Sequence, residues 1–171
     1  FVGQHLIRRL REEGHTPIAL ARSERSADIV RGAGADAVSG DLDDLTATGD
    51  VTRDPAWVGE LSTVDAVVHA AARMEFWGPD EGFRTDNHEP TIALHAAAAK
   101  AGVSRFVLIS AAGISTGTQR ARVVDEGTDD GVSMIAYGRV KLATENALRD
   151  APTPGMALVI LRPPFIWGPG L

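Results

Sequence analysis

The sequence predicts an α/β fold in which helices cover both faces of a doubly wound parallel sheet, in three layers. Three continuous apolar runs rich in β-branched residues carry this prediction, at residues 65–70, 105–110 and 157–161 (DAVVHA, RFVLIS and ALVIL). Strands that helices cover on both faces have this composition. Helical segments alternate with the runs, which indicates parallel strands joined by right-handed crossovers.

The first elements lie in the N-terminal third of the chain. A helix is predicted over residues 2–13, because its apolar residues share one face and Gly14 is a C-terminal stop signal. Weaker strand signals follow at residues 16–22 and 35–40. Residues 39–55 are predicted to form the longest loop.

Two later helices precede the last two strands. An alanine-rich helix is predicted from about Asn87 to Lys100 and ends at Gly102. The stretch AYGRVKLATE, residues 136–145, contains the only tyrosine of the chain, Tyr137, followed four residues later by a lysine.

Composition excludes several function classes. The chain has 171 residues, 44% of them apolar and 23% charged, which is the make-up of one globular domain. A net charge of −6 argues against a nucleic-acid surface, and the absence of cysteine excludes disulfides and thiolate chemistry. No apolar run approaches the roughly 18 residues of a membrane span. We therefore expect a cytoplasmic protein without a membrane or nucleic-acid partner.

Small residues follow two of the predicted strands. Ligands of parallel sheets bind beyond the carboxyl ends of the strands. There His69 is followed by three alanines, and Ser110 is followed by Ala-Ala-Gly. Small side chains let a flat, extended ligand approach the backbone closely, and a dinucleotide fits this description.

Six short motifs follow one another along the chain: FVGQHL, GDLDD, VVHAAA, DNHEPT, YGRVK and LRPPFIWGPG. Their order resembles the extended short-chain dehydrogenase/reductases, the nicotinamide-dependent group of epimerases, dehydratases and steroid dehydrogenases. The resemblance covers nearly the whole chain and implies a Rossmann-type NAD(P)-binding domain over residues 1–171.

The resemblance also bears on the two ends of the sequence. The family opens with a strand and a G-x-x-G-x-x-G turn, and Gly3 matches the third glycine of that turn. We therefore expect a fragment, truncated at both ends, that lacks the first strand and the C-terminal substrate-binding part. The absent strand would lie between the strands that end at Ala21 and Ala70.

Tyr137 and Lys141 are the first catalytic candidates. On an α-helix they lie on one face, one turn apart. A phenol is a poor base near neutral pH, and a neighbouring ammonium stabilises its phenolate. Tyr137 can then exchange a proton with a substrate oxygen while the nicotinamide transfers a hydride. The resemblance implies in addition that Lys141 holds the nicotinamide ribose.

Ser110 and Asn87 complete the predicted catalytic set. Alignment with the family pattern puts Ala111 at the position of its catalytic serine or threonine, with Ser110 one residue earlier. Successive strand residues point to opposite faces, so Ser110 can take the role only if the strand has already ended; Ser115 is the alternative. Asn87 matches the asparagine that supports the proton relay of the family, and it also suits a helix N-cap, so both interpretations stay open.

The residues at the end of the strand predicted at 16–22, which corresponds to the second strand of the family, predict the cofactor. An acid there would bind the adenosine ribose, whereas this chain has Ala21 followed by Arg22, which can pair with a 2′-phosphate. NADP(H) is therefore expected over NAD(H), and the alternative for Arg22 is a solvated loop residue. The adenine is expected against Asp41 and Leu42, with Asp50 as the competing position.

Four further residues are predicted to contact the cofactor, at the first helix and the later strand ends: Gly3, Ala70, Ala71 and Pro163. No metal is expected. His88 and His95 lack the i, i+4 spacing of a zinc-binding helix, and Pro90 suits a first helical turn.

The predicted function is an NADP-dependent oxidoreductase that interconverts a secondary alcohol and a ketone of a steroid-like or other apolar alicyclic substrate. The aromatics Phe76, Trp77 and Phe83 could line an apolar pocket or could simply pack. One alternative is a nucleotide-sugar epimerase or dehydratase of the same family. The other is a catalytically weakened sensor that binds NAD(P). The expected partner is a small-molecule substrate, with a homodimer as a further expectation.

Overall fold

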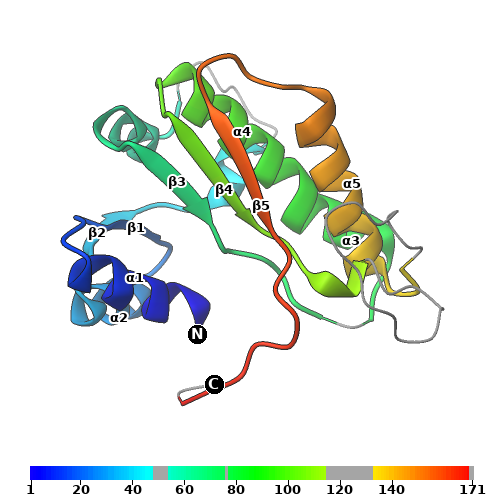
Figure 1. The fold of residues 1–171 in the computed structure, drawn as a ribbon, viewed down its shortest axis with the longest axis horizontal. Coiled ribbons are helices and arrows are strands. Elements are labelled where there is room, and N and C mark those ends of the chain that lie inside the picture. The colour runs from blue at the N-terminus through cyan, green and yellow to red at the C-terminus, as the bar shows by residue number, and fades with distance from the viewer. Residues whose placement is uncertain (48–53, 76, 115–132, 170–171) are drawn as a thin grey trace.

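The structure, a computed structural model, describes residues 1–47, 54–75, 77–114 and 133–169 (Figure 1). Strands and helices alternate in it, and all strand pairs are parallel, so the predicted α/β Rossmann-type architecture is confirmed. The strands of the described residues are β1 (Ile18–Ala21), β2 (Asp36–Ser39), β3 (Ala66–His69), β4 (Arg105–Ile109) and β5 (Ala157–Leu161).

These strands form two sheets. β1 pairs with β2, and β3, β4 and β5 form a second sheet in that order. The register places Phe106 of β4 opposite Val67 and Leu158. Within the described residues β1 and β3 each pair on one side only, and the strand expected between them has no counterpart there.

The larger helices lie on different sides of the strands. Helices α4 (Glu89–Lys100) and α5 (Ala136–Asp150) cover one face of the β3–β5 sheet, whereas α1 (Val2–Glu12) and α2 (Glu24–Ala33) lie with β1 and β2 (Figure 1).

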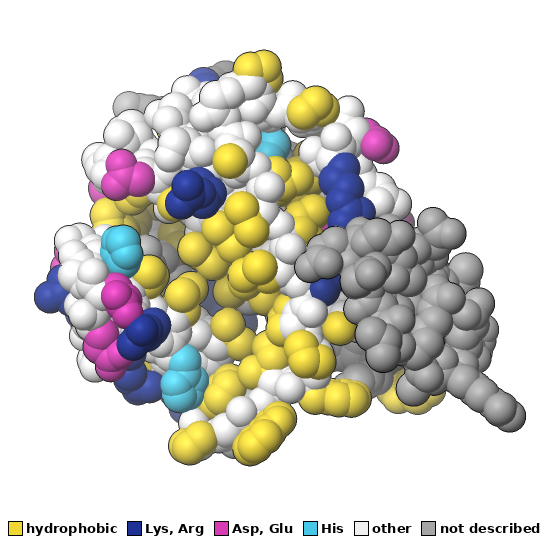
Figure 2. All heavy atoms as spheres, in the orientation of Figure 1, with side chains coloured by type: hydrophobic (Ala, Val, Ile, Leu, Met, Phe, Trp, Pro, Cys, Tyr) yellow, Lys and Arg dark blue, Asp and Glu magenta, His cyan; other side chains and the backbone are white. Residues whose placement is uncertain are grey.

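The main core lies between the β3–β5 sheet and α4. Phe106 and Leu108 point into it and have no exposed surface, and Leu94, Ala98 and Leu148 of the two helices pack against them. Alternate residues of β4 and β5 point to the opposite face, where Figure 2 shows hydrophobic side chains gathered near the middle of the view. This core packs against one face of β3, β4 and β5 and so holds the carboxyl ends of these strands in place.

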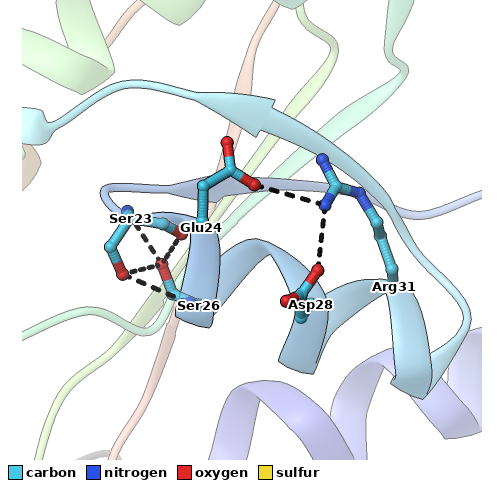
Figure 3. Close-up of polar contacts among 5 residues, drawn as sticks. All are labelled: Ser23, Glu24, Ser26, Asp28 and Arg31. Atoms are coloured by element: carbon cyan, nitrogen blue, oxygen red, sulfur yellow. Dashed lines mark hydrogen bonds and ion pairs between the residues drawn. The ribbon is translucent and has the colours of Figure 1, made fainter.

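Helix α2 was not predicted individually. The Ser23 hydroxyl accepts the Ser26 N–H, and the Ser26 hydroxyl accepts the Ser23 N–H, which is a capping box with serine in place of glutamate (Figure 3). Gly34 ends the helix at φ 105°, a conformation that glycine adopts readily. Serine at the third position of the box is a weaker start signal than glutamate, which explains the omission.

The alanine-rich helix begins before its predicted start. Helix α3 (Asp80–Phe83) continues through a π-helical turn (Arg84–His88) into α4 without a break. Pro90 has no N–H for the Asp86 carbonyl, and its ring would crowd that carbonyl in a regular α-helix. A π turn relieves both problems and commonly occurs at functional sites.

Short 3₁₀ helices complete the described structure. One (Leu42–Leu45) lies inside the segment predicted as the longest loop, a second (Ala56–Thr63) precedes β3, and a third (Ala112–Ile114) follows β4. None of the helices in the described part of the chain is long and apolar enough to cross a membrane.

Candidate active site

Helix α5 brings Tyr137 and Lys141 to the carboxyl end of β4. The Lys141 ammonium donates a hydrogen bond to the carbonyl of Ile109, the last residue of β4, at 3.1 Å. Its Nζ lies 5.8 Å from the centroid of the Tyr137 ring. Tyr137 is half-buried and Lys141 is buried. The predicted pair is therefore together in space and fixed to the sheet.

Packing and an ion pair hold the start of α5, and with it the Tyr137 ring, against the preceding segments. A Cβ on Gly138 would overlap the Ser133 hydroxyl, so glycine lets the preceding segment pack against the helix. Arg139 pairs with Asp80 of α3 at 2.9 Å. Phe83, the last residue of α3, meets the Tyr137 ring edge-on with centroids 6.3 Å apart. Phe83 is fully buried, so it packs beneath Tyr137 and does not line a pocket.

Burial sets the protonation states of the pair. It raises the pKa of the Tyr137 phenol above its ordinary value. It lowers the pKa of Lys141 to about 8, against the opposing effect of the Glu145 carboxylate. The sequence predicted a phenol acidified by Lys141, whereas here the ammonium lies near the ring and bonds to a backbone carbonyl. At neutral pH the phenol keeps its proton, which suits a proton donor.

Ser110 lies one residue beyond β4, so the condition set by the sequence prediction is met. Its N–H donates to the Leu161 carbonyl at 2.7 Å, and its side chain is buried. Its hydroxyl oxygen has no hydrogen-bond partner. Among the described residues, it is the only buried side-chain nitrogen or oxygen atom without one. Buried hydroxyls are normally paired, so this one marks a place where a hydrogen-bond partner is missing. Ser115 lies outside the described residues.

Asn87 lies inside the π turn. Its side-chain oxygen accepts the Arg73 N–H at 2.7 Å, and its amide nitrogen donates to the Arg73 carbonyl at 3.1 Å. The N-cap interpretation is wrong, because the helix begins at Asp80 and Asn87 caps nothing. Its place in a proton relay stays a prediction. The contact seen here ties the segment after β3 to the π turn.

His69, the last residue of β3, is buried next to the same turn. Its Nε2 lies 2.8 Å from the Thr91 hydroxyl, which itself donates to the Asn87 carbonyl at 2.5 Å. His69 is therefore the donor in its own hydrogen bond, which fixes the Nε2–H tautomer. Burial, with the Lys141 charge in addition, lowers the pKa of His69 to about 4.

This histidine should make the fold sensitive to acid. The unfolded chain binds the imidazole proton below about pH 6.5, and the folded chain binds it only below about pH 4. The free energy of unfolding should therefore fall by about 3 kcal/mol as the pH drops through this window. Denaturant titrations at several pH values measure the slope. His69→Gln keeps a donor for Thr91 and cannot titrate, so its slope should be flatter; equal slopes would contradict the assignment.

The predicted adenine site lies after β2. The Asp41 carboxylate accepts the Asp43 N–H at 3.3 Å, and the Asp44 carboxylate accepts both the Asp41 N–H at 3.0 Å and the Trp57 indole N–H at 3.2 Å. A Cβ on Gly40 would overlap the Trp57 ring, which explains the glycine before Asp41. These bonds fix the backbone at Asp41 and Leu42. Asp50 lies outside the described residues.

Arg22 follows β1 and is exposed. No hydrogen bond or ion pair holds it among the described residues, whereas Arg31 of α2 pairs with both Glu24 and Asp28 (Figure 3). Burial and the Asp41 carboxylate raise the pKa of Asp43, and the Arg22 charge opposes them.

The remaining predicted cofactor residues surround the ends of the strands. Ala70 and Ala71 follow β3, and the Pro163 carbonyl accepts the Ala112 N–H at 3.0 Å, which joins the segments after β4 and β5. Gly3 is exposed in the first turn of α1, with open space where a Cβ would lie. An apolar hollow of about 410 Å³ separates α1 from these strand ends; its lining includes Phe1, Val2, Leu6, Ile109, Leu161, Pro163 and Ile166.

The structure thus gathers Ala70, Ser110, Tyr137, Lys141 and Pro163 at the β3–β5 ends. Arg22, Asp41 and Leu42 lie at the β1–β2 ends. Glu145 and Thr91 also lie close to this site, and the sequence singled out neither of them as functional. Within the described parts of the chain, no three His, Asp or Glu side chains are grouped so as to hold a metal ion.

A sequence profile of a family described as NAD(P)H-binding matches residues 1–167. The chain belongs to this NAD(P)H-binding family, within the extended short-chain dehydrogenase/reductases.

Named relatives of this NAD(P)H-binding domain include two reductases. It is 32% identical to a 2-alkyl-3-oxoalkanoate reductase of Stenotrophomonas maltophilia (strain K279a), over 99% of this chain and 49% of the relative. It is 30% identical to a 4-hydroxy-2-methyl-3-oxo-4-farnesyl-3,4-dihydroquinoline-1-oxide ketoreductase of Stigmatella aurantiaca, over 98% and 48% respectively.

A solved structure of similar fold is a UDP-glucose-4-epimerase from Stenotrophomonas maltophila with bound NAD and formylated UDP-arabinopyranose. It has 26% sequence identity and a TM-score of 0.74, and the match covers 95% of this chain and 49% of that one. The chain thus spans about half the length of the relatives that it matches.

Proposed function

We propose that this domain serves an NADP-dependent reductase that converts an apolar ketone into a secondary alcohol. The observation that carries the proposal is the protonated, half-buried phenol of Tyr137, placed with Lys141 and the unpartnered Ser110 hydroxyl at the carboxyl ends of the strands. A donor phenol at neutral pH favours reduction over oxidation.

The residues present fit a nicotinamide dinucleotide. Small residues follow β3 and β4, and the Arg22 guanidinium after β1 is exposed, where the adenosine ribose would bind. The buried Ser110 hydroxyl lacks a hydrogen-bond partner among the described residues, and a bound ligand would supply one. When bound, the cofactor would supply the hydride for the carbonyl carbon.

The side chains would manage the proton. Tyr137 would donate the phenol proton to the carbonyl oxygen, and Ser110 would donate a hydrogen bond to the same oxygen as negative charge develops on it. The ammonium of Lys141 would offset the charge left on the phenolate and would hold a ribose hydroxyl. Asn87 would contribute by fixing the segment that begins at Arg73.

The surroundings of the site support an apolar substrate. Several large hydrophobic side chains of the described residues are more than 70% exposed and come from the segments after β3, before α5 and after β5: Met74, Trp77, Met134, Phe165 and Trp167. Exposed apolar side chains on the segments next to the site suit an apolar ligand better than a nucleotide sugar. The reductase relatives, whose names specify alkyl- or farnesyl-bearing keto compounds, support the same class.

The second candidate is a nucleotide-sugar epimerase, favoured by the likeness to a solved UDP-glucose-4-epimerase. Protein expressed from its complete reading frame can distinguish the two. We expect NADPH to be consumed with hydrophobic 3-oxo compounds or alicyclic ketones, and no interconversion of UDP-glucose and UDP-galactose. Epimerisation without ketone reduction would overturn the proposal, and cofactor binding without either reaction would support a sensor.

Cofactor preference tests the role of Arg22. The double substitution Ala21→Asp and Arg22→Asn removes a phosphate partner and supplies a ribose acceptor, so the ratio of NADPH to NADH affinity should fall by about 10- to 100-fold. Fluorescence titrations with both cofactors measure the ratio. Arg31→Asn removes the same charge at the far end of α2 and should leave the ratio unchanged. An unaltered ratio in the double variant would remove Arg22 from the site.

A further inference from the structure

Glu145 is an ionisable residue that the proposed mechanism does not use. It lies on α5 one turn after Lys141, and its side chain has no exposed surface. Burying a carboxylate is costly unless charges and hydrogen bonds compensate it, so its retention here needs a physical reason.

Two arginines compensate the carboxylate. Arg162 lies directly after β5, and its Nε donates to both carboxylate oxygens of Glu145 at 3.1 Å, with a further bond from its terminal nitrogen. Arg149, one turn further along α5, donates to the same carboxylate at 2.9 Å. The Arg162 side chain is 22% exposed and that of Arg149 is 43% exposed. The Glu145–Arg162 pair therefore joins α5 to the end of β5 in a mostly buried setting.

The same carboxylate acts on Lys141. Residues four apart on a helix lie on one face, so Glu145 and Lys141 are neighbours. The other groups that face the ammonium are the Tyr137 ring, the Ile109 carbonyl and the neutral imidazole of His69. Burial lowers the pKa of Lys141, and Glu145 is the charged group that raises it. No ion pair joins the two side chains among the described residues, because the carboxylate is bonded to Arg149 and Arg162, so Glu145 favours the ammonium of Lys141 at longer range.

We propose that Glu145 is a positioning residue for the Tyr137–Lys141 pair: its carboxylate, held by Arg162, orients the helix turn that carries Lys141 and keeps the ammonium protonated near neutral pH. Loss of the carboxylate charge would leave the buried ammonium of Lys141 and the mostly buried guanidinium of Arg162 without this negative charge nearby. A larger fraction of the lysine would then lose its proton near neutral pH, and with it the charge that offsets the phenolate. The inference rests on the proposed function for its meaning, but its test requires no turnover.

The 171 residues contain two lysines, Lys100 and Lys141. Lysine labelled with ¹³C at Cε reports the protonation of each amine by NMR. Lys100 is exposed and ion-paired with Asp54, which raises its pKa, whereas Lys141 should titrate at about 8. In protein expressed from its complete reading frame, the Lys141 signal is assigned by its loss in Lys141→Gln.

Glu145→Gln keeps the shape and one acceptor oxygen but removes the charge. We expect it to lower the Lys141 midpoint by about one unit or more, which reduces the protonated fraction at pH 8 from about half to about one tenth. The Lys100 midpoint should not move. Arg149→Gln, which removes the more exposed partner of the same carboxylate, should leave the Lys141 midpoint unchanged. Glu145→Asp keeps the negative charge, so its Lys141 midpoint should stay close to that of the unmodified protein.

A purely structural ion pair gives a different result. In that case Glu145→Gln would lower thermal stability and leave the Lys141 midpoint in place, which would overturn the proposal. If Glu145→Gln does not fold, the double variant Glu145→Gln, Arg162→Gln removes both charges and leaves neither uncompensated. Loss of the Arg162 charge by itself favours the Lys141 ammonium, so the midpoint of the double variant is compared with that of Arg162→Gln. It should be lower in the double variant, and equal midpoints would overturn the proposal. Failure to reduce any ketone would instead count against the proposed function alone, since the titration is read without substrate.

Discussion

Replacement of Tyr137 by phenylalanine should reduce ketone reduction by about a thousandfold and leave NADPH binding almost unchanged. The substitution deletes the proton donor of the proposed site, and general acid catalysis is typically worth a factor of 10² to 10⁴. It removes little volume, and the edge-on contact with Phe83 involves the ring, which phenylalanine keeps. The kcat should therefore fall while the stability and the cofactor affinity persist.

The comparison with Lys141→Met sharpens this result. Lys141 bonds to the end of β4 and would also hold the cofactor ribose, so its loss should lower both kcat and the affinity for NADPH. Stopped-flow reduction and fluorescence titration of the two variants measure the two quantities separately. A Tyr137→Phe enzyme with undiminished kcat would remove Tyr137 from the reaction, and a Lys141→Met enzyme with normal NADPH affinity would remove Lys141 from the ribose site.

Ser110→Ala should lower kcat by about a hundredfold without loss of stability. One hydrogen-bond donor to a developing alkoxide is typically worth this factor or more. The Ser110 hydroxyl has no partner among the described residues, so its removal also ends the cost of an unpaired buried group, which is about 1–3 kcal/mol. Activity and the free energy of unfolding should therefore move in opposite directions, which is unusual for a buried residue.

A matched control lies at the other end of the same strand. The Ser104 hydroxyl donates to the Asp65 carbonyl at 2.8 Å, so Ser104→Ala loses a satisfied bond and should cost about 1 kcal/mol with kcat unchanged. If Ser110 has taken the role of the serine that Ala111 replaces, Ala111→Ser should change little. A large acceleration in Ala111→Ser, or a Ser110→Ala enzyme of full activity, would show that Ser110 is not the donor.

The local parts of the site could be predicted from sequence. Tyr137 and Lys141 lie on one helix, where spacing alone brings side chains together. The parallel strands were predicted for a similar reason, because a run of apolar β-branched residues needs cover on both faces. Helix α2 was missed because its start signal at Ser23 and Ser26 is local but weak.

The non-local parts could not be predicted in the same way. The N-cap interpretation of Asn87 failed because Pro90 widens the preceding turn and the helix begins at Asp80, and the partner of Asn87 is the backbone of Arg73, 14 residues away. A carboxylate at position 145 has the pattern of any solvated helix residue until Arg162 is found beside it.

By itself, the sequence determined the α/β class, the NAD(P)H-binding family and the face of α5 on which Tyr137 and Lys141 lie. These features follow from side-chain periodicity and from short motifs. Only the tertiary structure decided the protonation of the pair, the unpartnered hydroxyl of Ser110 and the burial of Glu145. The physical reason is that pKa values and hydrogen-bond satisfaction depend on the atoms that surround a group and exclude water from it, and those atoms come from strands and helices that are distant along the chain.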